Sequence, residues 1–325
     1  MDKITIVIPN YNGKKYLEGC LQALEKEREC PETPEFEILV VDNGSADGSA
    51  ESAAERFPDV KIVFLKENTG FCHAVNVGIR KSQAPYVILL NNDTKVKTGF
   101  VKNLYFAIKK RSDIFSVSAK MLMWDNPELI DDAGDYYCAL GWAYGRGKGK
   151  PACRYEKPAE VFSACAGAAI YRRGIFEKIG LFDENHFAYL EDLDIGYRAR
   201  IWGYCNFYEP KAEVLHFGSA STGSRYNERK TVLAASNSVY VIAKNMPLLQ
   251  ILCNLPFLSV GFLVKFLFFC KKGMGILYLK GLWKGFRRSV SREGRKCKVP
   301  FSSKNLRHYL RIQMELWANL FQLNS

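Results

Sequence analysis

Two acidic segments, far apart in the chain, carry the side chains best suited to chemistry. Asn91-Asn92-Asp93 directly follows the apolar run 86–90, which predicts a buried strand of a parallel sheet. Because open α/β sheets bind ligands at the carboxyl ends of their strands, Asp93 is expected in a binding site. Glu191 and Asp192 begin a predicted helix. One carboxylate at a strand end and another at a helix start suit metal binding and proton transfer, which indicates an enzyme.

Strand and helix signals alternate ahead of Asp93. Strands are predicted at 4–8, 36–41, 60–65 and 86–90, and helices at 14–26, 46–56 and 71–81. This alternation favours an α/β protein with a doubly wound, mostly parallel sheet flanked by helices. Neither Gly-x-Gly-x-x-Gly nor Gly-x-x-x-x-Gly-Lys-Ser/Thr occurs, so the common dinucleotide-binding and P-loop folds lose their main support.

The positive charge of the chain is concentrated near its end. The 325 residues carry a formal net charge of +12, and their 48% hydrophobic and 25% charged shares are typical of a folded protein. Residues 1–264 hold 32 basic and 32 acidic groups, whereas 265–311 hold fourteen Lys or Arg against Glu293 alone. The ten cysteines form no Cys-x-x-Cys pair, and no signal-peptide pattern opens the chain. A reducing, cytoplasmic compartment without disulfides or a zinc site is therefore expected.

Two further segments have unusual composition. Residues 131–157 alternate glycines with aromatic residues, which suits either an irregular connection or a mobile wall over a substrate cleft. Residues 247–270 are strongly apolar, and 276–288 mix apolar, aromatic and basic residues. That mixture is typical of a helix in a bilayer interface, so we expect membrane contact. The alternative is a helical subdomain that packs on the core with its charges solvated.

Five segments together resemble a known family. They are Ile8-Pro9-Asn10-Tyr11-Asn12-Gly13, Val40-Val41-Asp42-Asn43-Gly44-Ser45, Asn68-Thr69-Gly70-Phe71, Leu90-Asn91-Asn92-Asp93-Thr94, and Tyr189-Leu190-Glu191-Asp192-Leu193-Asp194 with a distant His216. The chain resembles the family 2 glycosyltransferases of the GT-A fold, and within them bacterial rhamnosyltransferase-type enzymes of surface polysaccharide synthesis. The resemblance implies a catalytic domain at 1–245, with a nucleotide-sugar half at 1–125 and an acceptor half at 126–245. Residues 246–325 then form a helical, membrane-associating extension.

The resemblance also implies a pocket for a nucleotide sugar. Asp42 ends a predicted strand, and its carboxylate can accept a hydrogen bond from the imide N–H that uracil and thymine share. The family places its nucleobase contact there, whereas the alternative is that Asp42 caps the next helix. The small residues around Gly167 either let a sugar approach the backbone or simply allow tight sheet packing. The predicted nucleotide-sugar residues are Pro9, Tyr11, Asp42, Asn76, Asn91, Asn92 and Gly167.

Metal binding is assigned by the resemblance to Asp93 and His216. Asn91 stands where the family's Asp-x-Asp pattern often has its first acid, which removes one negative charge from the site. Mg or Mn is the expected cofactor, because such cations prefer oxygen ligands and bridge phosphates. The alternative for His216 is a purely structural role, which is common for a lone histidine after a strand. If His216 is a ligand, its imidazole favours Mn over Ca.

The resemblance implies that Asp192 is the general base and that Glu191 orients the acceptor or braces the neighbouring backbone. The helix N-terminus is expected to help keep Asp192 ionised. The implied reaction is an inverting sugar transfer, with rhamnose from a dTDP-linked donor or a hexose from a UDP-linked one. The implied acceptor is a glycan or lipid-linked saccharide at the inner face of the cytoplasmic membrane, and no nucleic acid partner is expected. The alternatives are a sugar nucleotidylyltransferase, and a nucleic-acid- or lipid-binding protein without catalysis.

Overall fold

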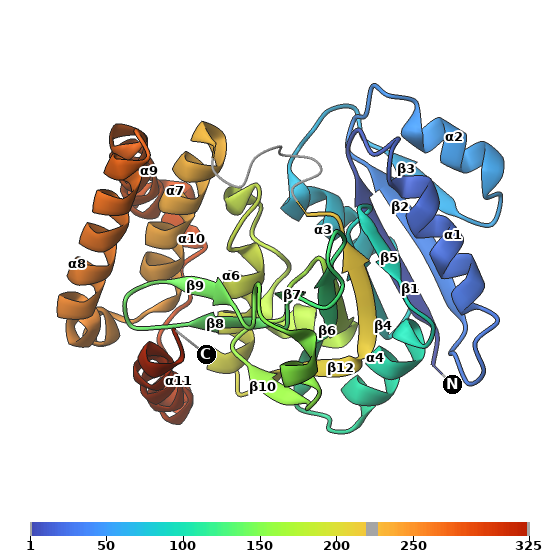
Figure 1. Cartoon of the computed structure of the whole chain (residues 1–325). Helices are drawn as coiled ribbons and strands as arrows, with labels where there is room; N and C mark the ends of the chain where they lie inside the picture. Colours follow the sequence, from blue (N-terminus) through green and yellow to red (C-terminus); the bar gives the residue numbers. More distant parts are fainter. Residues whose placement is uncertain (1, 219–226, 324–325) are drawn as a thin grey trace.

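A ten-stranded mixed sheet forms the centre of the computed structural model, which describes residues 2–218 and 227–323. Its main strand order is β10-β12-β6-β11-β4-β1-β2-β3, with β5 paired to β12 and β7 to β6 (Figure 1). The strands are β1 Ile4–Asn10, β2 Phe36–Asp42, β3 Lys61–Phe64, β4 Tyr86–Leu90, β5 Thr94–Val96, β6 Ile114–Met123, β7 Ile130–Asp132, β10 Ala159–Val161, β11 Ala168–Arg172 and β12 Cys205–His216. The neighbours β3, β2, β1 and β4 are parallel, whereas β11 is antiparallel to β4 and β6.

Helices cover both faces of this sheet. Because side chains alternate along a strand, Ile6 and Ile8 of β1 pack in one apolar core and Val7 packs in the other. The first core includes side chains of α1 Leu17–Glu27, α2 Ser49–Arg56 and α4 Phe100–Lys109. The second includes side chains of α3 Phe71–Lys81, α5 Phe176–Ile179 and α6 Glu191–Ile201. The predicted α/β class and helix-flanked sheet are confirmed.

The predicted strands and helices of the first half are present, with shifts at some helix starts. The helix predicted at 14–26 begins at Leu17, and the one predicted at 46–56 begins at Ser49. Both starts are late because the residues before them form turns that join neighbouring strand ends: the Asp47 carboxylate accepts the Lys14 and Ser49 N–H groups at 2.8 and 3.0 Å. These turns belong to the candidate site described below.

The glycine- and aromatic-rich segment 131–157 is more regular than either interpretation expected. It contains part of β7 and a hairpin of β8 Asp135–Tyr137 with β9 Ala143–Gly145. The end of this hairpin packs on a later helix, where Trp142 Nε1 donates to the Gly261 carbonyl at 3.0 Å. The segment therefore connects the central sheet to the C-terminal helices.

The C-terminal helices gather at the end of the molecule opposite α1 and α2 (Figure 1). They are α7 Glu228–Asn245, α8 Leu248–Lys271, α9 Gly275–Val290, α10 Arg292–Lys296 and α11 Leu306–Ala318. A third apolar core joins them to α6 through side chains such as Tyr197, Val241, Leu258 and Ile312. Within the described ranges, α8 alone is long and apolar enough to cross a membrane by length and composition.

Candidate active site

Polar side chains meet where β1, β2 and β4 end. Asn10 and Asp42 are aligned in the parallel register of β1 and β2, and both are buried. Asn10 Nδ2 donates to Asp42 Oδ1 at 2.8 Å, and Asn92 Nδ2 donates to Asn10 Oδ1 at 2.7 Å. Three strand ends are thus tied together by side-chain amides. Asn92 has a positioning role in this arrangement.

The carboxylate of Asp42 is held by its own turn. Ser45 donates twice, from its backbone N–H to Oδ2 at 3.0 Å and from its hydroxyl to Oδ1 at 2.6 Å. Asp42 therefore closes the turn before α2, although Gly48 occupies the N-cap position of that helix. Nearby, Pro9 is half-buried, and the Tyr11 ring is exposed at the surface. A base contact at Asp42 remains a prediction, and it has to use the carboxylate within this hydrogen-bonded turn.

Asn91 and Gly167 lie against each other. The Asn91 N–H donates to the Gly167 carbonyl at 2.8 Å, at the point where β11 pairs with β4. A side chain at position 167 would start 3.1 Å from Asn91 Nδ2 and 3.3 Å from the end of Met121. A larger residue at 167 would therefore press on the ends of two flexible side chains, so the small residue eases packing here.

Asp93 and His216 come together because β5 pairs with the end of β12. Thr94 is opposite His216 in this antiparallel register, and the Phe217 N–H donates to the Asp93 carbonyl at 3.0 Å. The Nε2 atom of His216 lies 3.4 Å from Asp93 Oδ1. The other ring nitrogen, Nδ1, lies 2.6 Å from Oδ2 of Asp131. The histidine is held by one carboxylate and faces another.

This arrangement suits a divalent cation. Metal-binding histidines commonly donate one ring N–H to a carboxylate, which fixes the ring and leaves the other nitrogen for the metal. Burial opposes the charged imidazole, but hydrogen bonds to Asp131 and Asp93 raise the pKa of His216 to about 9. Burial likewise opposes ionisation of Asp131, yet hydrogen bonds from His216 and Lys148 and the Lys148 charge lower its pKa to about 2. The imidazole thus lies between the carboxyl groups of Asp93 and Asp131, an arrangement that favours positive charge. Asp93, His216 and the donor set fit Mn or Mg.

Asp192 lies in the first turn of α6, after a stretch of unusual backbone. Phe187, Tyr189 and Leu190 have positive φ angles of 60°, 70° and 65°. Side chains other than glycine rarely adopt this conformation, and such residues cluster at functional sites. The αL conformation of Leu190 begins the helix, so that the Leu193 N–H donates to Asp192 Oδ1 at 2.7 Å.

Burial dominates the electrostatics of the acidic pair. It raises the pKa of Asp192 to about 6, although backbone N–H groups of Leu193, Asp192 and Ala166 act in the opposite direction. The helix start therefore only partly offsets burial, contrary to the simple expectation. Burial and the Asp192 charge also raise the pKa of Glu191, whose Oε2 accepts no hydrogen bond from described residues. A carboxyl group with a pKa near 6 can accept protons at neutral pH.

Two short segments connect the metal-ligand pair to Asp192. In β7, Asp131 contacts His216. Burial and the charges of Asp131 and Asp192 raise the pKa of the next residue, Asp132, to about 7. Just before β11, the Gly167 carbonyl accepts from the Asn91 N–H, and the N–H of the neighbouring Ala166 faces Asp192. Residues adjacent in the chain thus lie near Asp192 on one side and near His216 or Asn91 on the other. Asp93, His216 and Asp192 belong to one region of the molecule.

A residue from α7 holds the strained segment before Asp192. The buried side chain of Asn237 donates from Nδ2 to the carbonyls of His186, Ala188 and Tyr189 at 3.0, 2.9 and 2.8 Å. Its Oδ1 accepts from Arg288 of α9 at 2.9 Å. Sequence reasoning did not identify Asn237 or Asp131. Asp131 could have been noticed as part of an acidic pair, whereas no local signal marks Asn237.

A second group of possible metal ligands consists of Asp183, His186 and Asp194, whose ligand atoms lie within 4.8 Å of one another. Lys244 Nζ occupies this group, 2.7 Å from Asp183 and 2.8 Å from Asp194. Arg198 also pairs with Asp194 at 2.9 Å. Because two cations already balance the two acids, this group is best described as a buried ion-pair network. Asp194 is therefore a buried, ion-paired acid of the first turn of α6.

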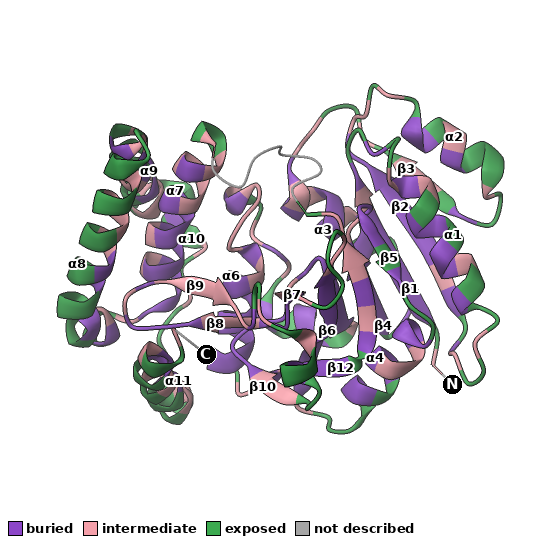
Figure 2. Ribbon diagram, viewed as in Figure 1, coloured by how far each residue is buried: buried purple, intermediate pink, exposed green. Residues whose placement is uncertain are grey.

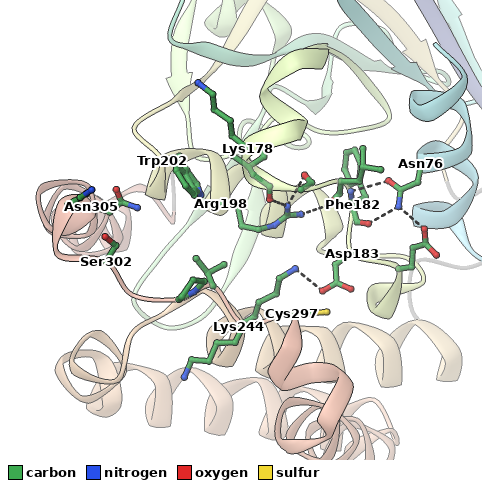
Figure 3. Close-up of a pocket in the computed structure, with 18 of the residues that line it drawn as sticks. Asn76, Lys178, Phe182, Asp183, Arg198, Trp202, Lys244, Cys297, Ser302 and Asn305 are labelled. Carbon is green, nitrogen blue, oxygen red and sulfur yellow. Dashed lines mark hydrogen bonds and ion pairs between the residues drawn. The ribbon is translucent and has the colours of Figure 1, made fainter. Parts of the chain in front are cut away.

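Asn76 lies away from the other predicted residues. Its amide donates to the Phe182 carbonyl at 2.8 Å and accepts from the Phe182 N–H at 3.1 Å, so it fixes the loop after α5. It lines a cavity of about 740 Å³ that also includes Arg198 and Lys244 (Figure 3). A role for Asn76 at the diphosphate is therefore not supported, because its hydrogen bonds are used in packing.

Comparisons with known proteins identify the family and agree with the fold. Residues 5–180 match the sequence profile described as Glycosyl transferase family 2. An N-acetylglucosaminyl-diphospho-decaprenol L-rhamnosyltransferase of Mycobacterium tuberculosis is 31% identical over 250 residues, covering 68% of this chain and 78% of the relative. The structure of S. aureus TarS 1–349 with UDP-GlcNAc is similar with a TM-score of 0.59 at 18% identity, covering 98% of this chain and 92% of TarS 1–349. The Pyrobaculum calidifontis mannosyltransferase PcManGT, with GDP-Man and Mn²⁺, is similar with a TM-score of 0.52 at 14% identity, covering 100% and 88%.

Proposed function

The chain belongs to glycosyl transferase family 2, and we propose that it moves a sugar, with inversion, from a nucleoside diphosphate to a membrane-linked saccharide. The observation that carries this proposal is the buried Asp93–His216 pair, with Asp131 on the other side of the imidazole and the next residue, Asp132, close enough to Asp192 for their charges to interact. Family membership favours sugar transfer over nucleotidylyl transfer, and it leaves no reason to invoke a protein without catalysis.

In the proposed reaction, an acceptor hydroxyl oxygen attacks the anomeric carbon as the bond from that carbon to the diphosphate breaks. Asp192 accepts the hydroxyl proton, and the nucleoside diphosphate leaves. Glu191 orients the acceptor from the same helix turn, and Asp132 beside Asp192 suits hydrogen bonds to other acceptor hydroxyls. Asp93 and His216 would hold a divalent cation, with Asp131 fixing the imidazole ring. A bound Mn or Mg would supply positive charge for the departing diphosphate. The Mn²⁺ in the PcManGT structure supports this cofactor.

The donor and acceptor are proposed from the relatives. The name of the Mycobacterium tuberculosis relative supports rhamnose as the transferred sugar and includes a decaprenyl diphosphate acceptor, and we propose dTDP as the carrier of the rhamnose. UDP-linked hexoses are the second choice, since TarS was solved with UDP-GlcNAc. Pro9, Tyr11 and Asp42 are proposed to bind the nucleobase. The apolar and basic C-terminal helices suit work at the inner face of the cytoplasmic membrane, where such acceptors are anchored.

A donor panel tests this function. Purified protein with Mn²⁺ should release nucleoside diphosphate from one sugar nucleotide in an acceptor-dependent manner, and NMR of the product should show the inverted anomeric configuration. Transfer with retention, or release that is equal with every donor and independent of acceptor, would rule out the proposed reaction.

A further inference from the structure

The α8 helix is oriented with its polar residues toward the protein and its apolar residues outward. The residues of α8 that are buried are Gln250, Asn254, Leu258 and Gly261. Their spacing of four, four and three residues marks one side of a helix. Large apolar side chains cover the rest, and Figure 2 shows the outer part of α8 as largely exposed. The exposed apolar residues are Leu248, Leu249, Leu252, Leu255, Phe257, Val260, Leu263, Val264, Leu267 and Phe268.

The polar side of α8 is bonded to the rest of the protein over its first half. Gln250 accepts from the Tyr197 hydroxyl of α6 at 2.9 Å, and Asn254 donates to Gln313 of α11 at 2.8 Å. Two turns after Asn254, the Gly261 carbonyl accepts from Trp142 of the β8–β9 hairpin at 3.0 Å. A side chain at position 261 would start 2.1 Å from the Leu140 carbonyl, so this approach requires glycine.

These contacts determine how α8 can meet a membrane. A helix that crosses a bilayer has lipid around its middle, so its partners there must also lie in the hydrocarbon. The hydrogen-bond partners of α8 are Tyr197 of α6, the helix whose first turn holds Asp192, Gln313 of α11, and Trp142 of the β8–β9 hairpin. Tyr197 and Trp142 belong to the domain that is proposed to bind a charged nucleotide sugar in water. A spanning α8 would have to break all three hydrogen bonds.

The adjacent helix α9 carries the charge that an anionic lipid surface attracts. Gly281 and Gly285 pack on α7, where a Cβ would start 2.7 Å from Ala235 and 2.3 Å from the Ser236 carbonyl. This packing turns Trp283 outward, with 60% of its surface exposed. The exposed basic residues on the same helix are Lys280, Lys284 and Arg287. Tryptophan at the interface and cations at the headgroups are the pattern of a helix that lies on a membrane.

We infer that α8 is an in-plane membrane anchor: its Leu- and Phe-rich side enters one leaflet, its polar side stays on the enzyme, and α9 contacts anionic headgroups. The inference deepens the proposed membrane-surface role and is independent of which sugar is transferred. A second copy of this chain is a poorer occupant, because interfaces between proteins are depleted in lysine and twofold contact would oppose the basic residues of α9.

Vesicle flotation tests the occupant. The full chain should float with vesicles of phosphatidylglycerol and phosphatidylcholine, and more weakly with phosphatidylcholine alone. Leu263→Glu with Leu267→Glu should weaken binding at least ~10-fold, because it places charge on the lipid side. Phe106→Glu, on exposed α4 at the other end of the chain, is the matched control and should bind normally. Equal flotation of both variants, or a concentration-dependent dimer lost only in the double variant, would overturn the inference.

Spin-label depth separates an in-plane helix from a spanning one. Leu252 and Cys270 are 18 residues apart, which is five turns, so they share one side of α8 at a separation of about 27 Å. Two proteins are labelled, one at Leu252→Cys and one at native Cys270, and in each the other accessible thiols are replaced by serine. Both labels should report similar, shallow depths in one leaflet. Depths in opposite leaflets would show a spanning helix. Because the depth measurement needs no substrate, its result does not depend on whether the proposed sugar transfer is correct. The result of the donor panel likewise does not depend on whether α8 spans the membrane.

Discussion

The Nδ1 atom of His216 lies 2.6 Å from Oδ2 of Asp131, so the opposite ring nitrogen faces Asp93. This hydrogen bond fixes the orientation of the His216 ring, so that Nε2 is in place to bind a metal ion. It also makes Asp131 a positioning residue, because it contacts the imidazole and lies one residue from Asp132 beside Asp192.

Asp131→Asn should weaken Mn²⁺ binding about 10- to 100-fold, because the imidazole loses the carboxylate that fixes its orientation. Electron paramagnetic resonance titration of free Mn²⁺ measures this without substrate. Asp125→Asn is the matched control, since Asp125 is exposed on the same segment. An unchanged Mn²⁺ affinity in Asp131→Asn would remove its positioning role.

The acid side of the pH–rate profile should report Asp192. A general base works in its deprotonated form, and the raised pKa of about 6 means that this form is lost as the pH falls through 6. At saturating Mn²⁺ and donor, kcat should fall about tenfold per pH unit below that value. A profile that stays flat down to pH 5 contradicts the assignment.

Asn237→Ala should lower kcat at least ~10-fold while the donor Kd changes little, because small displacements of a catalytic group carry large rate costs. The substitution removes three hydrogen bonds to the strained segment before Asp192. Ser238→Ala on the same helix is the control, as Ser238 bonds only within α7. A parallel loss in both variants would indicate general damage to α7.

Lys244→Met should lower the free energy of unfolding by about 3–5 kcal/mol, because it leaves buried acids without a partner. Lys61→Met, which breaks an exposed pair with Glu37, should cost only about 0–1 kcal/mol. Urea unfolding at pH 7 compares the two variants.

Despite its burial, neighbouring cations lower the pKa of Asp194 below that of the unfolded chain. Its stabilisation is therefore complete above about pH 4 and is lost as the pH falls further.

Much of the fold could be predicted because its signals are local. Apolar runs marked all four parallel strands of the first half, and the acids after residue 190 marked the start of α6. Asp93 and His216 could be paired only through the family resemblance, since their proximity depends on β5 pairing with β12. Asp131 was hidden in a segment read as irregular, and Asn237 acts through contacts about fifty residues away. Such long-range hydrogen bonds leave no periodic pattern in the sequence.

The most direct test of the shared site compares two single substitutions in one set of measurements. In Asp192→Asn, the affinities for Mn²⁺ and donor should stay within about twofold of the original, while kcat falls ~10²- to 10⁴-fold. In Asp93→Asn, Mn²⁺ binding and turnover should be lost together. Near-normal turnover in Asp192→Asn, or undiminished Mn²⁺ affinity in Asp93→Asn, would contradict the account.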